Sequence, residues 1–377
     1  MAQLFSNVGT LSWQQVVMWL IGAILIYLAI RKDMEPSLLL PMGFGAILVN
    51  LPLSGVINQF TAGLGETPGI IQWLFETGIG VSEALPILLF IGIGAMIDFG
   101  PLLADPKLLI FGAAAQAGIF LTLILASALG FPIREAASIA VIAAADGPTS
   151  IFVANYYSSK YLGAIIVAAY SYMALVPILQ PPVIRLMTTK KERKIRMKYA
   201  PKSVSKTTKI LFPILITVIS GILAPKSVAL IGFLMFGNLI RECGVLEQLS
   251  ETAQKVLANL ITLLLGLTVA TKMQADLFLA PDTLLILGLG LAGFVLDTAG
   301  GVLVAKLVNL FLPEGKKVNP MIGAAGISAF PMSARIVHKM GQQEDDQNFL
   351  LMHAVAVNVS GQIASVLAAG ALLTLVP

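Results

Sequence analysis

The sequence predicts an all-α polytopic membrane protein made of two inverted-topology repeats, each with about five transmembrane helices and one re-entrant broken segment. Three observations support this prediction. Of the 377 residues, 57% are hydrophobic and 12% are charged, whereas soluble domains carry about 25% charged residues. Apolar runs long enough to cross a bilayer recur along the chain. Two halves with similar motifs lie on either side of one strongly basic stretch.

The composition also argues against several classes of function. A single cysteine, Cys243, cannot form an intramolecular disulfide, and with two scattered histidines, His338 and His353, we do not expect a zinc site. The net charge of +4 does not indicate a nucleic-acid partner, because the excess of Lys and Arg is concentrated in one stretch between apolar blocks. The first apolar run ends at Arg31 and Lys32 without a small-residue cleavage site, so we expect it to remain as a membrane helix.

Apolar runs define ten candidate crossings. In chain order they are residues 13–30, 38–56, 84–103, 108–129, 160–187, 208–224, 227–240, 259–280, 284–312 and 349–376. Two further apolar stretches, 134–155 and 319–338, are interrupted by Gly, Pro and polar residues. These two are the candidates for re-entrant segments.

The basic stretch sets the orientation. Residues Arg185 to Lys209 hold ten Lys or Arg and one acid, Glu192, so the positive-inside rule places them in the cytoplasm. The predicted division is a first repeat over 1–190, a basic cytoplasmic linker over 191–209, and a second repeat over 210–377. Alternation then puts the loop 57–83 and both termini outside, with 134–155 entering from the outer face and 319–338 from the inner face.

The two halves resemble each other in sequence. Pro36 to Val56 aligns without gaps with Pro225 to Val245, matching at Pro, at Gly-Phe and at the final Gly-Val. DGPTS at 146–150 falls opposite SAFPMS at 328–333. An odd number of crossings in each half forces the second copy to be upside down, and inverted repeats with broken segments are typical of alternating-access transporters.

The first break, AAADGPTSIF at 143–152, carries the main functional signal. A carboxylate at the bilayer centre costs roughly 3 kcal/mol, so Asp146 is expected to face protein, water or a bound cation. Gly147 and Pro148 cannot continue a regular helix. The backbone N–H and C=O groups that lose their helical hydrogen bonds there are tolerated within a membrane only around a protein-lined cavity. The alternative is a helix boundary at which Asp146 caps the following turn.

Neutral oxygens accompany this carboxylate in three segments. The second break, NPMIGAAGISAFPMSARIV at 319–337, includes Gly323 and Pro331 as break residues. One carboxylate surrounded by neutral oxygens suits a monovalent hard cation. The alternative for each neutral residue is an interhelical hydrogen bond. The candidate cation-binding residues are Asp146, Thr149, Asn319, Ser328 and Asn358.

Three other residues within the apolar stretches are candidates. Arg335, just beyond the second break, is suited to binding a carboxylate from the cytoplasm, although the positive-inside rule alone also explains it. Tyr172 can donate a proton or be a packed aromatic residue. Asp297 is the most interior of the remaining acids, and it serves either a second ion or proton or a structural pairing between helices.

The three blocks AAADGPTSIF, NPMIGAAGISAFPMSARIV and NVSGQIAS (358–365) resemble the signature blocks of the membrane β subunit of sodium-pumping, biotin-dependent decarboxylases. That family acts on oxaloacetate, methylmalonyl-CoA or glutaconyl-CoA, and the resemblance runs from about Leu20 to the end of the chain. It implies that carboxybiotin on a partner subunit is decarboxylated here, which drives Na⁺ outward while a proton is consumed. By resemblance, Asp146, Ser328 and Asn358 take part in the cation pathway, and Tyr172 and Arg335 lie near the biotin chemistry.

The resemblance also implies partners and a location. The partners are a biotin carrier, a carboxyltransferase and a small membrane-anchor subunit, with several copies of this chain together in the cytoplasmic (inner) membrane of a bacterium or archaeon. No nucleophile–base triad or metal-ligand cluster is present in the sequence, so the chain is not expected to be active alone. A first half shorter than in oxaloacetate-type members favours a CoA ester as the substrate of the complex.

One rival class shares the features that the residues themselves predict. An autonomous secondary carrier, such as a Na⁺/H⁺ antiporter or a Na⁺/carboxylate symporter, would have the same inverted repeats and the same carboxylate. A membrane anchor without a transport function would explain neither Asp146 nor the two breaks.

Overall fold

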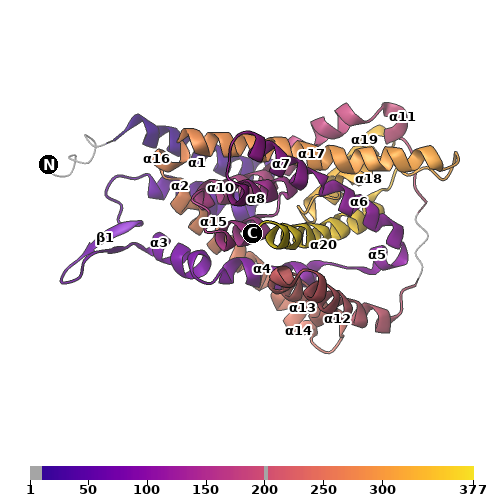
Figure 1. The fold of residues 1–377 in the computed structure, drawn as a ribbon, viewed down its shortest axis with the longest axis horizontal. Coiled ribbons are helices and arrows are strands. Elements are labelled where there is room, and N and C mark those ends of the chain that lie inside the picture. The colour runs from indigo at the N-terminus through magenta and orange to yellow at the C-terminus, as the bar shows by residue number, and fades with distance from the viewer. Residues whose placement is uncertain (1–10, 199–202) are drawn as a thin grey trace.

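A computed structural model of the chain describes residues 11–198 and 203–377. Over these residues the chain is helical almost throughout, with one two-stranded antiparallel hairpin (Figure 1). The predicted all-α polytopic class is therefore confirmed.

The elements of the first half follow each other with short connections. They are α1 (Trp13–Lys32), α2 (Pro36–Val49), β1 (Asn58–Thr61), β2 (Gly65–Pro68), α3 (Ile70–Phe75), η3 (Glu76–Gly80), α4 (Ala84–Met96), α5 (Gly100–Ala104), η4 (Pro106–Leu108), α6 (Leu109–Ala115), α7 (Ala117–Ala128), α8 (Ile133–Ala140), η5 (Val141–Ala144), α9 (Gly147–Tyr156) and α10 (Leu162–Met187).

The linker and the second half continue in the same manner. Their elements are α11 (Lys190–Arg193), α12 (Lys206–Leu223), η6 (Pro225–Ser227), α13 (Val228–Glu242), α14 (Glu247–Glu251), η7 (Thr252–Leu257), α15 (Ala258–Val269), η8 (Ala270–Lys272), α16 (Ala275–Phe278), α17 (Pro281–Phe311), α18 (Met321–Ala324), α19 (Met332–Glu344) and α20 (Leu351–Leu375).

Seven helices among the described residues are long and apolar enough to cross a membrane. Their ranges are Trp13–Lys32, Pro106–Ala128, Leu162–Met187, Lys206–Leu223, Glu247–Lys272, Pro281–Phe311 and Leu351–Leu375. An eighth crossing results if α3 to η3 and α4 count as one span, which bends by 68° at its break.

The other predicted spans form short helices, and α2 and α4 are shorter than the runs predicted from the sequence. The runs 38–56, 84–103 and 227–240 contain α2, α4 and α13, which have 14, 13 and 15 residues. At 1.5 Å per residue each measures about 20 Å, which is less than the roughly 30 Å of a hydrocarbon core. α2 stops because the Asn50 side chain turns to bond other backbone groups. α4 stops before Asp98, whose Oδ1 accepts a hydrogen bond from the backbone N–H of Gly100 at 2.8 Å.

The predicted outer loop 57–83 is more structured than a loop. β1 pairs with β2 from Asn58 opposite Pro68 to Thr61 opposite Gly65, and α3 and η3 follow directly. The hairpin projects from the helical body beside α3 (Figure 1).

Helices of the two halves pair reciprocally. α2 of the first half packs on α15 of the second, and α13 of the second half packs on α4 of the first. The Asn50 amide bonds the carbonyl of Met273 at 2.7 Å, and the Asn238 amide bonds the carbonyl of Ile97 at 2.9 Å. Each asparagine thus ties the end of one half's helix to the opposite half.

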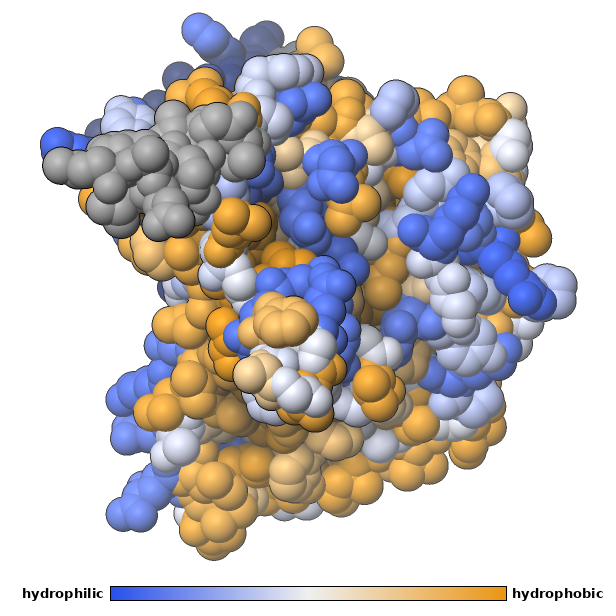
Figure 2. Space-filling model, turned by 90° about the vertical axis from the view of Figure 1, so that its left-hand side faces the viewer, coloured by the Kyte–Doolittle hydropathy of each residue, from blue (hydrophilic) through white to orange (hydrophobic). Residues whose placement is uncertain are grey.

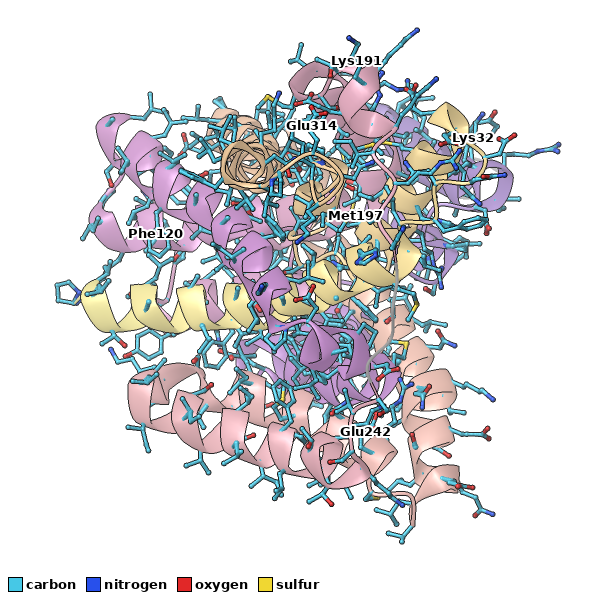
Figure 3. All side chains as sticks on the ribbon, turned by 90° about the vertical axis from the view of Figure 1, so that its right-hand side faces the viewer. Lys32, Phe120, Lys191, Met197, Glu242 and Glu314 are labelled. Carbon is cyan, nitrogen blue, oxygen red and sulfur yellow. The ribbon has the colours of Figure 1, made fainter. Side chains whose placement is uncertain are left out.

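The last helix, α20, occupies the centre of the molecule. Both ribbon views place it between α17 on one side and the α12–α13 pair on the other (Figures 1 and 3). Most of its residues are buried, its polar residues Asn358, Gln362 and Ser365 included. By contrast, α1 and α12 expose much of their apolar surface, as expected for lipid-facing helices, and Figure 2 shows hydrophobic surface over much of one end of the molecule.

Candidate cation site

The first break lies between η5 and α9. The chain leaves η5 through Ala145 in the left-handed region at φ 51°, and Asp146 then adopts an extended conformation as the N-cap of α9. Pro148 lies in the first turn of α9, where its missing N–H leaves no helical hydrogen bond unmade. The Asp146 carboxylate is therefore placed at a helix N-terminus, where the aligned peptide dipoles favour negative charge.

The Asp146 carboxylate is buried and receives three hydrogen bonds. Its Oδ1 accepts from the backbone N–H of Thr149 at 3.2 Å, and its Oδ2 accepts from Gln362 Nε2 at 3.2 Å and from Ser365 Oγ at 3.1 Å. The Thr149 hydroxyl lies beside the same carboxylate without forming a well-aligned hydrogen bond. Among the described residues, no Lys or Arg forms an ion pair with Asp146.

The second break meets the first at this point. The backbone N–H of Ser328 donates to the carbonyl of Ala144 at 3.0 Å, so the two interrupted segments are hydrogen-bonded to each other. Between α18 and α19 the chain runs without helix through a cis peptide bond before Pro331. The Ser328 hydroxyl donates to the carbonyl of Gly361 on α20 at 3.4 Å.

Asn358 completes this junction. Its Nδ2 donates to the carbonyl of Ile327 at 2.7 Å, while its Oδ1 is buried without a hydrogen-bond partner among the described residues. The junction therefore brings together one carboxylate, several hydroxyls and an amide oxygen that is free to accept. Hard cations prefer oxygen ligands of this kind, and a single carboxylate matches a single positive charge.

Glycines allow close packing in both interrupted segments. A Cβ on Gly147 would lie 2.5 Å from the ring of Tyr170, and a Cβ on Gly323 would lie 2.1 Å from the carbonyl oxygen of Gly301 on α17. The break residues predicted from the sequence, Gly147, Pro148, Gly323 and Pro331, thus all lie in the two interrupted segments.

Asn319 lies apart from the carboxylate. Its Nδ2 donates to the carbonyls of Arg193 and Ile195 at 2.9 Å each, and its Oδ1 accepts from the backbone N–H of Met321 at 3.1 Å. The structure therefore joins Asn319 to the basic linker instead of bringing it to Asp146, because its amide satisfies backbone carbonyls at the start of the second break.

Tyr172 and Arg335 lie outside the carboxylate cluster. The Tyr172 hydroxyl donates to the carbonyl of Leu287 on α17, and the side chain is buried. Arg335 is exposed on α19 and forms no ion pair within the described residues, although it acts electrostatically on Glu35. Burial raises the pKa of Glu35, and Arg335 opposes this shift.

Two residues near the carboxylate were not singled out by the sequence. The Ser365 hydroxyl donates a hydrogen bond to Asp146. The ring of Tyr170 packs against Gly147, the residue after Asp146. The spacing of Asn358, Gln362 and Ser365 was the available signal, since residues four and three apart share one face of a helix. Tyr170 offered no signal, because it lies in an apolar helix two residues before a second tyrosine.

A multi-pass helical membrane protein with a lone buried carboxylate where two helix breaks meet belongs to the class of ion-translocating membrane proteins. The family described as the Na⁺-transporting oxaloacetate decarboxylase beta subunit matches residues 14–376. The chain belongs to this family, and it is the membrane subunit of a primary Na⁺ pump and part of a decarboxylase complex.

Individual relatives agree. The chain is 48% identical over 365 residues to the glutaconyl-CoA decarboxylase subunit beta of Acidaminococcus fermentans, covering 97% of this chain and 94% of the relative. It is 45% identical over 383 residues to the methylmalonyl-CoA decarboxylase subunit beta of Propionigenium modestum, covering 97% and 95%. It is also 45% identical over 417 residues to a probable oxaloacetate decarboxylase beta chain of Vibrio cholerae, covering 96% and 95%. An autonomous secondary carrier is not favoured by these similarities.

Proposed function

We propose that this chain moves Na⁺ outward through the Asp146 site, driven by the decarboxylation of carboxybiotin that a partner subunit presents, with a proton taken up. The observation that carries the proposal is the buried Asp146 carboxylate at the junction of the two breaks and α20. An ionised carboxylate left empty in that position would be strongly destabilised. We therefore expect it to hold either Na⁺ or a proton whenever the surrounding segments move.

The proposed cation ligands are the oxygens gathered at this junction. They come from Asp146, Thr149, Ser328 and Asn358, and Ser365 joins them because its hydroxyl contacts the carboxylate directly. Asn319 is proposed to act differently, by holding the linker against the second break through its two hydrogen bonds to linker carbonyls.

Arg335 is proposed to receive the carboxylate of carboxybiotin at the cytoplasmic side. Its side chain is exposed and forms no ion pair within the described residues. A planar guanidinium can donate two parallel hydrogen bonds to the two oxygens of one carboxylate. Tyr172 is proposed as the proton donor for this chemistry, which requires its hydroxyl to leave the carbonyl of Leu287.

We propose further that residues 1–190 and 210–377 are inverted repeats joined by the basic linker 191–209. The reciprocal packing of α2 on α15 and of α13 on α4 supports this, as does the hydrogen bond between the two breaks. Cysteines introduced at Arg134 and Lys160, which flank the first break and are exposed, test the proposal. Labelling of both from the outer face only is expected, and labelling from opposite faces would contradict the re-entrant segment.

The proposed partners are a biotin carrier, a carboxyltransferase and a small membrane-anchor subunit, in the cytoplasmic (inner) membrane of a bacterium or archaeon, with several copies of this chain together. A CoA ester is the proposed substrate of the complex. Alignments with the two CoA-ester relatives extend over 365 and 383 residues, close to this chain's 377 residues. Alignments with oxaloacetate chains extend over 412 to 426 residues and therefore contain long insertions relative to this chain.

The deciding experiment is purification of the chain from its native membrane, followed by probing the co-purified subunits with avidin. A biotinylated partner, and Na⁺-dependent release of CO₂ from the complex, are expected. A complex without any biotinylated subunit, or with CO₂ release that is independent of Na⁺, would contradict the proposed function.

A further inference from the structure

A second carboxylate, Asp297, is buried at the crossing of α7 and α17. Figure 1 shows these two helices side by side. Asp297 has no exposed surface, and neither of its carboxylate oxygens makes an aligned hydrogen bond within the described residues. A Cβ on Gly118 of α7 would lie 2.1 Å from Asp297 Oδ1, so the carboxylate rests directly against the α7 backbone.

Each of the two crossing helices carries a buried hydroxyl without a hydrogen-bond partner among the described residues. Thr122 and Thr298 are fully buried, and their Oγ1 atoms also lack hydrogen-bond partners among the described residues. A Cβ on Gly293, one helical turn before Asp297, would lie 2.4 Å from Thr122 Oγ1. Residues four apart share a helix face, so Thr122 faces the side of α17 that carries Asp297.

The sequences of α7 and α17 match at their crossing, except that only α17 carries a charged residue there. Aligning Pro106 with Pro281 without gaps places Ala117-Gly118 opposite Ala292-Gly293 and Thr122 opposite Asp297. The contacts follow the same relation, because Gly118 lies against Asp297 and Gly293 lies against Thr122. The first half therefore offers a hydroxyl where the second half offers a carboxylate.

Within the part of the chain that the structure describes, no Lys or Arg forms an ion pair with Asp297. The helices that pack along α17, and α17 itself, carry few titratable or charged side chains, and none of these forms an ion pair or hydrogen bond with Asp297. They are Arg134 and Glu135 on α8, Tyr170, Tyr172 and Arg185 on α10, Asp276 on α16, and Asp282 and Lys306 near the two ends of α17. The backbone amides of Gly118 and Ile119, which face the carboxylate, supply at most about half an elementary charge at the start of α7.

The oxygen atoms available as ligands differ between this crossing and the Asp146 site. Na⁺ requires several oxygen ligands, and α7 and α17 use their carbonyls in regular helical bonds at this level. A proton requires a single oxygen, and the resulting neutral carboxyl can bond a threonine hydroxyl. An isolated buried carboxylate without a counter-ion is neutralised in preference to remaining charged.

We propose that the Asp297 crossing is a second cation site, selective for a proton, at the boundary between the two halves of the pump. The inference rests on the proposed function only insofar as the pump takes up a proton, because the binding of that proton does not depend on Asp146. Relative motion of the two halves changes the contact between α7 and α17, and this couples the proton to the movement.

Infrared spectroscopy of the assembled complex in lipid, with the spectrum of each variant subtracted from that of the wild type, tests the proposal. The wild-type complex is expected to show the carbonyl stretching band of a protonated carboxyl group that added Na⁺ does not remove. Asp297→Asn should abolish this band, while Asp146→Asn should leave it and remove only the Na⁺-sensitive changes. The symmetric exchange Thr122→Asp with Asp297→Thr should restore the band, which Asp297→Thr alone should lack.

Three results would overturn the proposal. They are a spectrum unchanged by Asp297→Asn, a band that disappears when Na⁺ is added, and an assembled exchange variant that lacks the band. Na⁺-sensitive changes that persist in Asp146→Asn would contradict the proposed function alone, so the two ideas fail separately. Unchanged amide bands and subunit composition show that each variant is folded and assembled.

Discussion

Replacing Ser365 with alanine should weaken Na⁺ binding without unfolding the protein. Its hydroxyl is one of two side-chain donors from α20 to Asp146 Oδ2, at 3.1 Å, and it also lies 3.1 Å from the carbonyl of Gln362. A hydrogen bond to a charged group contributes about 1.5–3 kcal/mol. Because one hydroxyl proton is divided between two acceptors, we take the lower value, which corresponds to about a tenfold loss of Na⁺ affinity.

The matched control lies on the same helix. Ser360 is equally buried, and its hydroxyl donates to the carbonyl of Leu109 at 3.2 Å, away from Asp146. Ser360→Ala should therefore cost about 1 kcal/mol of stability and leave the Na⁺ affinity unchanged. The assay is the Na⁺ concentration for half-maximal decarboxylation by the complex, together with calorimetric Na⁺ binding. An unchanged Na⁺ affinity in Ser365→Ala, or equal losses in both variants, would refute the reasoning.

Three further predictions rest on individual contacts of other residues. Arg335→Lys should lower turnover much more than it lowers Na⁺ affinity, because an ammonium lacks the planar fork, and unchanged turnover at saturating partner would remove Arg335 from the reaction. Gly323→Ala should destabilise the chain by about 1–3 kcal/mol, because its Cβ would lie 2.1 Å from a carbonyl oxygen of α17. Gly288→Ala on α17 is the control, since nothing lies within 4 Å of its added Cβ, and equal melting temperatures for the two variants would contradict this reading. The hydrogen bond from Arg196 lowers the pKa of Asp345 below its usual 3.8, so linker attachment should be constant above that pH and lost as pH falls below it, which limited proteolysis of the linker measures. A linker released already at neutral pH would count against this.

The sequence predicted the fold class because its signals are strong. Long apolar runs between polar turns define membrane helices whatever they pack against. The ends of α2 and α4 were predicted less well, because they depend on tertiary hydrogen bonds such as that from Asn50 to Met273, far along the chain. A short, mostly exposed hairpin such as β1–β2 gives only a weak local signal, and it was expected as a loop.

The candidate cation site could be predicted from the sequence where a short motif determines the backbone conformation by itself. Asp146 followed by Gly147-Pro148 specifies a broken segment by itself, and the structure makes Asp146 an N-cap and a buried carboxylate at once. The two sequence alternatives for Asp146 are therefore compatible. Asn319 shows the limit of this reasoning, because an amide in a polar motif can bond a cation or a carbonyl, and only the position of the linker decides which.

The most direct test of the central claim is Na⁺ binding to the purified complex at a series of pH values. If Asp146 holds either Na⁺ or a proton, the Na⁺ affinity should fall as pH decreases and added Na⁺ should release protons, since linkage requires both effects when the ions share one group. Asp146→Asn should lose both effects while remaining assembled. An intact Asp146→Asn complex that binds Na⁺ normally, or wild-type Na⁺ binding that does not depend on pH, would contradict the account.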